Sequence, residues 1–310
     1  MSIIPATWRR SSAFRKISAA MVAAAAAWSQ EPTAARFHHV HLNTTDPEAA
    51  ISFYTSKLET EKRAFAGTGD AVAVHRGWLL FTRVDRPPKS EITSAIWHLG
   101  WGGGEDMKDT YRKQVDSGTR FATPLTDISD QCDGKGGNGR FLFAYIDGPD
   151  HALIELNTTA AGNRRFGHVH LLSEDPVSAA EWYIKHFGLT RRGQGPMSRA
   201  PRSRCGRPTG PSVSLMTDDV SIIIYPVGNA KAAFPDAWRG RAEMDSTAGH
   251  SIDHLGFAVA DLDAALRRLR SAGVKVTEEA RSLAAGWRSA FVEGPDRIRI
   301  ELVGENVSPD

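Results

Sequence analysis

The sequence has very little cysteine. Among its 310 residues only Cys132 and Cys205 carry a thiol, and their spacing matches no metal-binding or redox motif. Both lie in segments rich in glycine and charged residues, where we expect reduced thiols, or one disulfide if the protein is exported. The sequence therefore offers no cysteine-based metal or redox centre.

An excess of charge of one sign is also missing. The chain has 38 basic and 36 acidic residues and a formal net charge of +2. The Arg-rich segment 198–207 is interrupted by proline and glycine and is typical of a solvated loop. Without a stripe of Lys and Arg, nucleic acid is excluded as the expected partner.

The alanine-rich apolar run at residues 17–28 is shorter than the roughly 18 to 20 residues that a spanning helix needs. Basic residues precede it, and Ala25 to Ala27 offer small side chains for cleavage. This pattern predicts a secretory signal peptide over residues 1–30 and export to the periplasm, with no membrane association of the mature protein. The alternative is an alanine-rich leader on a cytoplasmic protein.

What the sequence does contain is a repeated stretch. FHHVHLNTTDP begins at Phe37, and FGHVHLLSEDP begins at Phe166. Each copy predicts a strand followed by a helix, because aspartate caps a helix N-terminus and proline suits the first helical position. Internal repeats of this length indicate duplicated structural units.

A second repeated pattern follows each copy of the first. His98-Leu99-Gly100 recurs as His254-Leu255-Gly256, and the turn Gly148-Pro149-Asp150 recurs as Gly294-Pro295-Asp296. The order is therefore A, B, A′, B′, four units that each predict a strand, a helix and about three strands. We expect an α+β fold with two domains, residues 37–158 and 165–305.

Each expected domain contributes two histidines from opening strands and one glutamate from a closing strand. A glutamate within the apolar run Leu153-Ile154-Glu155-Leu156 would be costly to bury without a partner, and a metal is an efficient partner. Two imidazoles and one carboxylate suit a divalent ion that keeps open positions, such as Fe(II), Mn, Ni, Co or Zn. The predicted ligands are His39, His98 and Glu155, and His168, His254 and Glu301.

Further side chains accompany these ligands. His41 and His170 follow His39 and His168 by two positions, so they share a strand face with them and are candidates for acid/base catalysis or for simple packing. Tyr145, ahead of Glu155, is a candidate proton donor or a buried phenol. Arg299, just before Glu301, is a candidate for an ion pair with that glutamate, for lowering metal affinity or for anchoring an anionic substrate.

The four units resemble the βαβββ modules of the vicinal oxygen chelate superfamily, which includes glyoxalase I, the type I extradiol dioxygenases, and the fosfomycin and bleomycin resistance proteins. The resemblance covers about residues 37 to 305. It implies that the modules pair into two cup-shaped mixed-sheet domains. It also implies that His39, His98 and Glu155 hold one metal and that His168, His254 and Glu301 hold another, with Fe(II) favoured.

The resemblance implies a metal-dependent enzyme, dioxygenase-like or glyoxalase/isomerase-like, whose small-molecule substrate chelates the metal through neighbouring oxygens. Tyr145 and His41 are the expected catalytic residues. The first site is the more ordinary one because Leu153 precedes its glutamate by two positions, where the second site has Arg299. In the second pair Phe291 stands where the dioxygenase signature has tyrosine. Near Trp78 to Val84 there is no counterpart of the fourth carboxylate ligand of glyoxalase I. The alternative function is a non-catalytic protein that sequesters a small molecule. We expect a monomer or a homodimer.

Overall fold

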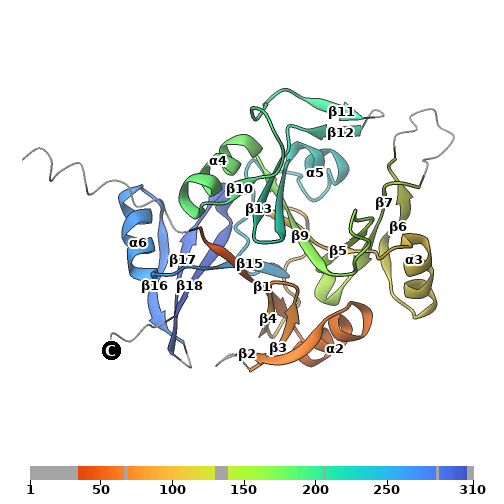
Figure 1. The fold of residues 1–310 in the computed structure, drawn as a ribbon, viewed down its shortest axis with the longest axis horizontal. Coiled ribbons are helices and arrows are strands. Elements are labelled where there is room, and N and C mark those ends of the chain that lie inside the picture. The colour runs from red at the N-terminus through yellow and green to blue at the C-terminus, as the bar shows by residue number, and fades with distance from the viewer. Residues whose placement is uncertain (1–33, 66–68, 130–138, 205–206, 284–285, 306–310) are drawn as a thin grey trace, which may run out of the picture. The chain divides into compact units, whose positions relative to one another are not determined.

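The computed structural model describes residues 34–65, 69–129, 139–204, 207–283 and 286–305 (Figure 1). These residues belong to one compact unit. The predicted signal peptide and both cysteines lie outside the described residues, so those expectations stay predictions. Within the described part, no helix is long and apolar enough to cross a membrane.

Each unit of the sequence folds as a strand, a helix and further strands, and the predicted α+β class is confirmed. Unit A contains β1 (Arg36–Thr44), α2 (Pro47–Lys57), β2 (Glu61–Phe65), β3 (Gly69–Val74) and β4 (Gly77–Arg83). Unit B contains β5 (Ile96–Gly102), α3 (Met107–Asp116), β6 (Phe121–Asp127), β7 (Leu142–Asp147), the 3₁₀ turn η1 (Pro149–His151) and β8 (Leu153–Asn157).

The second half of the chain repeats this order with additions. Unit A′ contains β9 (Phe166–Ser173), α4 (Pro176–Phe187), β10 (Thr190–Arg191), β11 (Arg202–Arg204), β12 (Arg207–Gly210), β13 (Val213–Thr217), β14 (Val220–Pro226) and α5 (Gly228–Ala233). Unit B′ contains β15 (Ile252–Ala258), α6 (Leu262–Ser271), β16 (Val276–Ser282), β17 (Trp287–Glu293), η3 (Pro295–Arg297) and β18 (Arg299–Glu305).

Helix starts follow the predicted chemistry. The side chain of Asp46 accepts a hydrogen bond from the backbone N–H of Ala49 at the start of α2, and Asp175 does the same for Val177 and Ser178 in α4. These caps satisfy N–H groups that the first helical turn leaves unpaired. The prediction of helices after Asp46 and Asp175 is confirmed.

The described strands form two eight-stranded mixed sheets and one two-stranded ribbon. Sheet 1 has the order β16-β17-β18-β15-β1-β4-β3-β2, and sheet 2 has the order β10-β13-β14-β9-β5-β8-β7-β6. Sheet 1 therefore joins unit A to unit B′, and sheet 2 joins unit B to unit A′. Figure 1 shows β1 beside β15 and β5 beside β9.

This pairing corrects the expected domains. Neighbouring units A and B do not share a sheet, so residues 37–158 and 165–305 are not the two halves of the fold. The strands of sheet 2 come from the continuous segment 96–226, and those of sheet 1 come from the segments before and after it. Two connections cross between the sheets and pair with each other at Lys89 with His250 and at Ser94 with Asp245.

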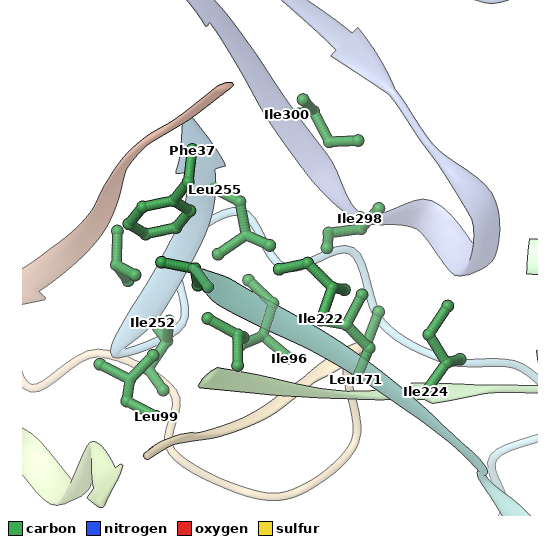
Figure 2. Close-up of a cluster of buried hydrophobic side chains, with 14 of the residues drawn as sticks. Phe37, Ile96, Leu99, Leu171, Ile222, Ile224, Ile252, Leu255, Ile298 and Ile300 are labelled. Atoms are coloured by element: carbon green, nitrogen blue, oxygen red, sulfur yellow. The ribbon is translucent and has the colours of Figure 1, made fainter. Parts of the chain in front are cut away.

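The opening strands have one face turned to a shared hydrophobic core and the other to the histidines. In each opening strand the residue next to a histidine points to the opposite face. These residues are fully buried and lie in one cluster: Val40, Leu99, Val169 and Leu255. Figure 2 shows Leu171 and Ile222 of sheet 2 in the same cluster as Leu255 and Ile300 of sheet 1. Each such side chain contributes about 1.5–3 kcal/mol when fully buried, so the core fixes the strand faces.

The repeated Gly-Pro-Asp turns join the sheets. Asp150 in η1 precedes β8 of sheet 2. Its carboxylate accepts hydrogen bonds from the hydroxyls of Thr44 and Thr45 at 2.5 and 3.0 Å, between β1 of sheet 1 and the start of α2. Asp296 in η3 accepts from the N–H of Glu174 at 3.0 Å, ahead of α4. The turn motif seen in the sequence is thus a contact between a closing strand of one sheet and a helix start of the other.

Glycines at the strand pairing make room for histidine rings. An added Cβ on Gly100 would lie 2.0 Å from the ring of His168, and one on Gly256 would lie 2.1 Å from the ring of His39. Gly100→Ala should therefore destabilise the protein by about 1–3 kcal/mol through overpacking. Gly167→Ala is the matched control, because its Cβ would meet nothing closer than 3.9 Å.

Urea unfolding of the two variants beside the wild type measures this difference. A Gly100→Ala protein as stable as Gly167→Ala would show that His168 does not pack on this glycine.

Candidate metal sites

The first candidate site, called cluster 1, lies on sheet 1. His39 comes from β1, His254 from β15 and Glu301 from β18, three neighbouring strands of the sheet. The Oε2 atom of Glu301 lies 3.0 Å from Nε2 of His39 and 3.2 Å from Nε2 of His254. All three side chains are buried.

The second site, called cluster 2, has the same arrangement on sheet 2. His98 comes from β5, His168 from β9 and Glu155 from β8. The Oε2 atom of Glu155 lies 3.0 Å from Nε2 of His98 and 2.9 Å from Nε2 of His168.

The six predicted ligands lie in two groups of three, as expected, but His39 and His168 have changed places between the two groups. His39 lies with His254 and Glu301, whereas His168 lies with His98 and Glu155. The prediction that His39, His98 and Glu155 form one set is wrong. The reason is the pairing of β1 with β15 and of β5 with β9, which places each opening histidine over a glycine of the partner strand.

The donor atoms fit a divalent metal. Neighbouring donors on an octahedral ion with bonds of about 2.1 Å lie about 3.0 Å apart, and the carboxylate oxygen is within 0.2 Å of that separation from both nitrogens in each cluster. Two imidazoles and one carboxylate on three strands leave the opposite positions of the ion free for substrate. His98, His168 and Glu155 would hold one ion, and His39, His254 and Glu301 another.

Electrostatics keep the glutamates ionised. Burial alone would raise the pKa of Glu155, but hydrogen bonds and charge interactions with His168 and His98 outweigh it and lower the pKa well below its ordinary value. Burial would likewise raise the pKa of Glu301, but its contacts with His254 and His39 outweigh burial and lower the pKa. Burial lowers the pKa of His98 and of His39, so these ligands are neutral imidazoles, the form that binds metal.

A third histidine joins each cluster. The ring of His41 lies 4.6 Å from that of His254, and the ring of His170 lies 4.3 Å from that of His98, centroid to centroid and nearly parallel. Their donor atoms fall within the metal-binding groupings of these sites. His41 pairs its Nε2 with the hydroxyl of Thr82 at 2.7 Å. In both rings Nδ1 is buried without a hydrogen-bond partner among the described residues.

Aromatic rings surround cluster 2. Tyr145 on β7 is paired in register with Glu155, and its ring lies 4.9 Å from that of His98. Tyr225 on β14 lies 4.9 Å from the ring of His170, and Trp97 lies 5.7 Å from it. Burial raises the pKa of both tyrosines, so both keep their protons at neutral pH.

Sequence reasoning identified Tyr145 but missed Tyr225 as a neighbour of the site. Tyr225 ends the apolar part of β14. Its polar hydroxyl at that position is the one feature of the sequence that could have indicated a place beside the site. In cluster 1 the position of Tyr145 is taken by Phe291, paired with Glu301, as the sequence predicts.

Charged residues surround cluster 1 instead. Arg299 lies 2.7 Å from Asp253 and 2.5 Å from Glu278, and its guanidinium stacks 3.8 Å above the ring of Phe291. Arg299 thus forms a structural ion pair, but with these carboxylates rather than with the ligand Glu301. Sequence reasoning missed Asp253, although it directly precedes the ligand candidate His254, and it missed Glu278, which lies on the separate strand β16.

Two mixed sheets of strand–helix–strand units, each with two histidines and a glutamate on adjacent strands, define a protein of paired βαβββ modules with candidate metal centres. Residues 165–302 match the family model described as the Glyoxalase/Bleomycin resistance protein/Dioxygenase superfamily. Over this segment, which is less than half of the chain, the protein is similar to that superfamily.

Solved structures share the fold over most of the chain. A V278E mutant of glyoxalase I from Zea mays has a TM-score of 0.62 at 15% identity and covers 91% of this chain and 96% of its own. A putative dioxygenase from Bacillus subtilis has a TM-score of 0.55 at 16% identity and covers 88% of this chain and 86% of its own. The comparison with curated proteins gave no match. At these identities the likeness shows the fold.

The buried histidines predict a pH dependence of stability. Burial lowers the pKa of His41 and His170 well below the ordinary value of 6.5, so the unfolded chain takes up protons first as the pH falls. Metal-free protein should therefore keep its full stability above pH 6.5 and lose up to about 1.4 kcal/mol per pH unit for each such histidine below it.

The measurement is urea unfolding in chelator at pH 7.5 and pH 5.5, with His170→Phe alongside. The variant should lose less stability between the two pH values than the wild type. An equal loss would show that His170 is not buried in its neutral form.

Proposed function

We propose that the protein is a divalent-metal-dependent enzyme whose working centre is cluster 2 and whose substrate is a small molecule with two neighbouring oxygen atoms. The convergence of three donors carries the proposal: Oε2 of Glu155 lies 3.0 and 2.9 Å from the two Nε2 atoms, and both histidines are buried. The match of residues 165–302 to the superfamily's model supports the same reading.

The donor set favours Fe(II), with Mn, Ni, Co and Zn as alternatives, and the bound ion would supply Lewis acidity or, as iron, the chemistry of dioxygen. His98, His168 and Glu155 hold this ion and leave its other positions to the substrate. Glu155 also keeps the site negative, which favours the divalent ion over a monovalent one.

Neighbouring side chains supply the proton chemistry. His170 is neutral, and its buried Nδ1 lacks a hydrogen-bond partner within the described chain, so it can take a proton from a substrate hydroxyl. Tyr145 keeps its proton because burial raises its pKa, so it can donate to a substrate oxygen beside Glu155. The rings of Trp97 and Tyr225 cover His170 and exclude water from it. His41 would have the role of His170 at cluster 1.

The element bound in cluster 2 distinguishes the two chemistries that the fold supports. Iron would favour cleavage of an oxygen-bearing ring by dioxygen, and a redox-inert ion such as Zn would favour isomerase or lyase chemistry. The strand positions beside the site on β14, Ser221, Ile223 and Tyr225, offer no fourth carboxylate, which favours the dioxygenase-like reading.

The aromatic surroundings also favour a second function, capture of a planar small molecule without catalysis. The rings of Trp97 and Tyr225 contact that of His170 in edge-to-face geometry, and Tyr145 lies 5.9 Å from Trp97. Aromatic side chains grouped in this way bind flat ligands without any metal. In that function, ligand binding would be unaffected by a chelator.

Elemental analysis tests the metal. Wild-type protein purified without a histidine tag should hold stoichiometric metal, and His98→Ala should lose the share bound in cluster 2 while His254→Ala keeps it. Near-zero metal in the wild type after anaerobic reconstitution would contradict the enzyme and support the capture function.

Binding of 4-nitrocatechol separates the two functions further, because its visible spectrum changes when both oxygens chelate a metal. We expect this change with wild-type protein, its loss in His98→Ala and its loss in chelator. Binding that persists in chelator with no spectral change would favour capture.

Tyr145→Phe tests the proton donor. The change keeps the ring and removes the hydroxyl, so turnover of a catechol or of a ketoaldehyde–thiol adduct should fall by about 10²–10⁴-fold while metal content stays the same. Tyr111→Phe is the control, because Tyr111 packs on Phe121 from helix α3. Equal activity of both variants would remove Tyr145 from the reaction.

A further inference from the structure

Asp253 is the partner that sets the orientation of His254 in cluster 1. Its carboxylate accepts four hydrogen bonds. They come from Nδ1 of His254 at 2.6 Å, Nη1 of Arg299 at 2.7 Å, the N–H of Gly249 at 2.7 Å and Nδ2 of Asn43 at 2.9 Å. An ionised carboxylate only accepts hydrogen bonds, so the proton of His254 must sit on Nδ1.

This places a bare lone pair on Nε2 of His254. That nitrogen lies 3.2 Å from Oε2 of Glu301, another atom that only accepts hydrogen bonds when ionised. Two lone pairs at this distance repel strongly in a buried site, and both side chains are less than a tenth exposed. The contact is stable only with a positive charge between the two atoms, either a proton or a metal ion.

His39 adds a second nitrogen to the same point. Its Nδ1 lies 2.7 Å from Nδ1 of His38, a buried histidine held between the rings of Phe65 and Trp287. Its Nε2 is 3.0 Å from Oε2 of Glu301 yet makes no hydrogen bond to any described residue. A single proton could join one nitrogen to the carboxylate, whereas a divalent ion satisfies both nitrogens and the oxygen together.

Cluster 2 has the same ligands without these partners. Trp97 stands at the position of Asp253, Gly167 at that of His38, and Leu153 at that of Arg299. The Nδ1 atom of His98 is accordingly buried with no hydrogen-bond partner among the residues the structure describes. The only carboxylate near the ring among the described residues is the ligand Glu155 itself, 3.0 Å from Nε2, so no carboxylate draws the proton of His98 to Nδ1.

We propose that cluster 1 is the tighter of the two metal sites and holds its ion permanently, because Asp253 fixes the tautomer of His254 and the contact with His38 orients the ring of His39. Cluster 2, which lacks these positioning residues, loads its ion more weakly and exchanges it. This inference rests on the proposed metal-dependent function. It assigns the clusters different tasks, a lasting ion in cluster 1 and substrate chemistry in cluster 2.

Partners of metal-bound histidines typically contribute 10–100-fold in affinity. We therefore expect cluster 1 to bind metal at least about tenfold more tightly than cluster 2. Removing the acceptor at Asp253 should cancel most of that advantage.

Anaerobic titration of the full metal-free chain with Co(II) measures each site. His98→Ala leaves cluster 1 alone, and His254→Ala leaves cluster 2 alone. Adding Asp253→Asn to His98→Ala should raise the Co(II) Kd by about 10–100-fold, and Asp253→Glu should restore part of the affinity. Leu153→Met in the His254→Ala background is the matched control at the position equivalent to Arg299 and should leave the Kd within about twofold.

The tautomer gives a readout that does not depend on a folded variant. Nitrogen-15 NMR of histidine-labelled, metal-free wild-type protein at pH 8 should show His254 protonated at Nδ1. A bare Nδ1 would overturn the inference, as would equal Kd values for the two clusters or an unchanged Kd in Asp253→Asn. Failure of the wild type to take up any Co(II) would instead overturn the proposed function itself.

Discussion

The antiparallel pairing of opening strands, β1 with β15 and β5 with β9, is the constraint on which the rest of the structure depends. It sets each pair of strands in a register where a glycine of one lies under a histidine ring of the other. The closing strands β18 and β8 then run parallel beside β15 and β5 and bring their glutamates to the same point. A candidate metal site built from three strands thus follows from one backbone register.

Much of this could be predicted from the sequence, because strand alternation and helix caps are local. The α+β class, the helices after Asp46 and Asp175 and the choice of all six ligand residues come from patterns within a few positions of each other. The partner of each opening strand could not be predicted. His98-Leu99-Gly100 and His254-Leu255-Gly256 present nearly the same surface to β1, and the discrimination lies in long-range packing that no short stretch encodes.

The two clusters show how little of a site its ligands determine. Identical ligand sets sit beside Asp253, Arg299 and His38 in one sheet, and beside Trp97 and Tyr145 in the other. Hydrogen-bonding partners fix which nitrogen of a ligand histidine is protonated and how its ring is oriented. Aromatic neighbours instead determine the shape of the space in which a substrate would bind. A duplicated fold can therefore keep one copy of a site for holding an ion and adapt the other for chemistry, with substitutions that leave the ligands untouched.

The crossed sheets also order the assembly of the protein in time. Sheet 2 comes from one continuous segment, residues 96–226, so its strands can pair as soon as that segment has left the ribosome. Unit A is made first but must wait for β15, across the whole inserted segment, before its opening strand gains its central partner. Contacts of such long sequence separation form slowly. Before β15 is made, the edge of β1 that pairs with it has no partner strand, and such an edge favours pairing with β15 of another copy.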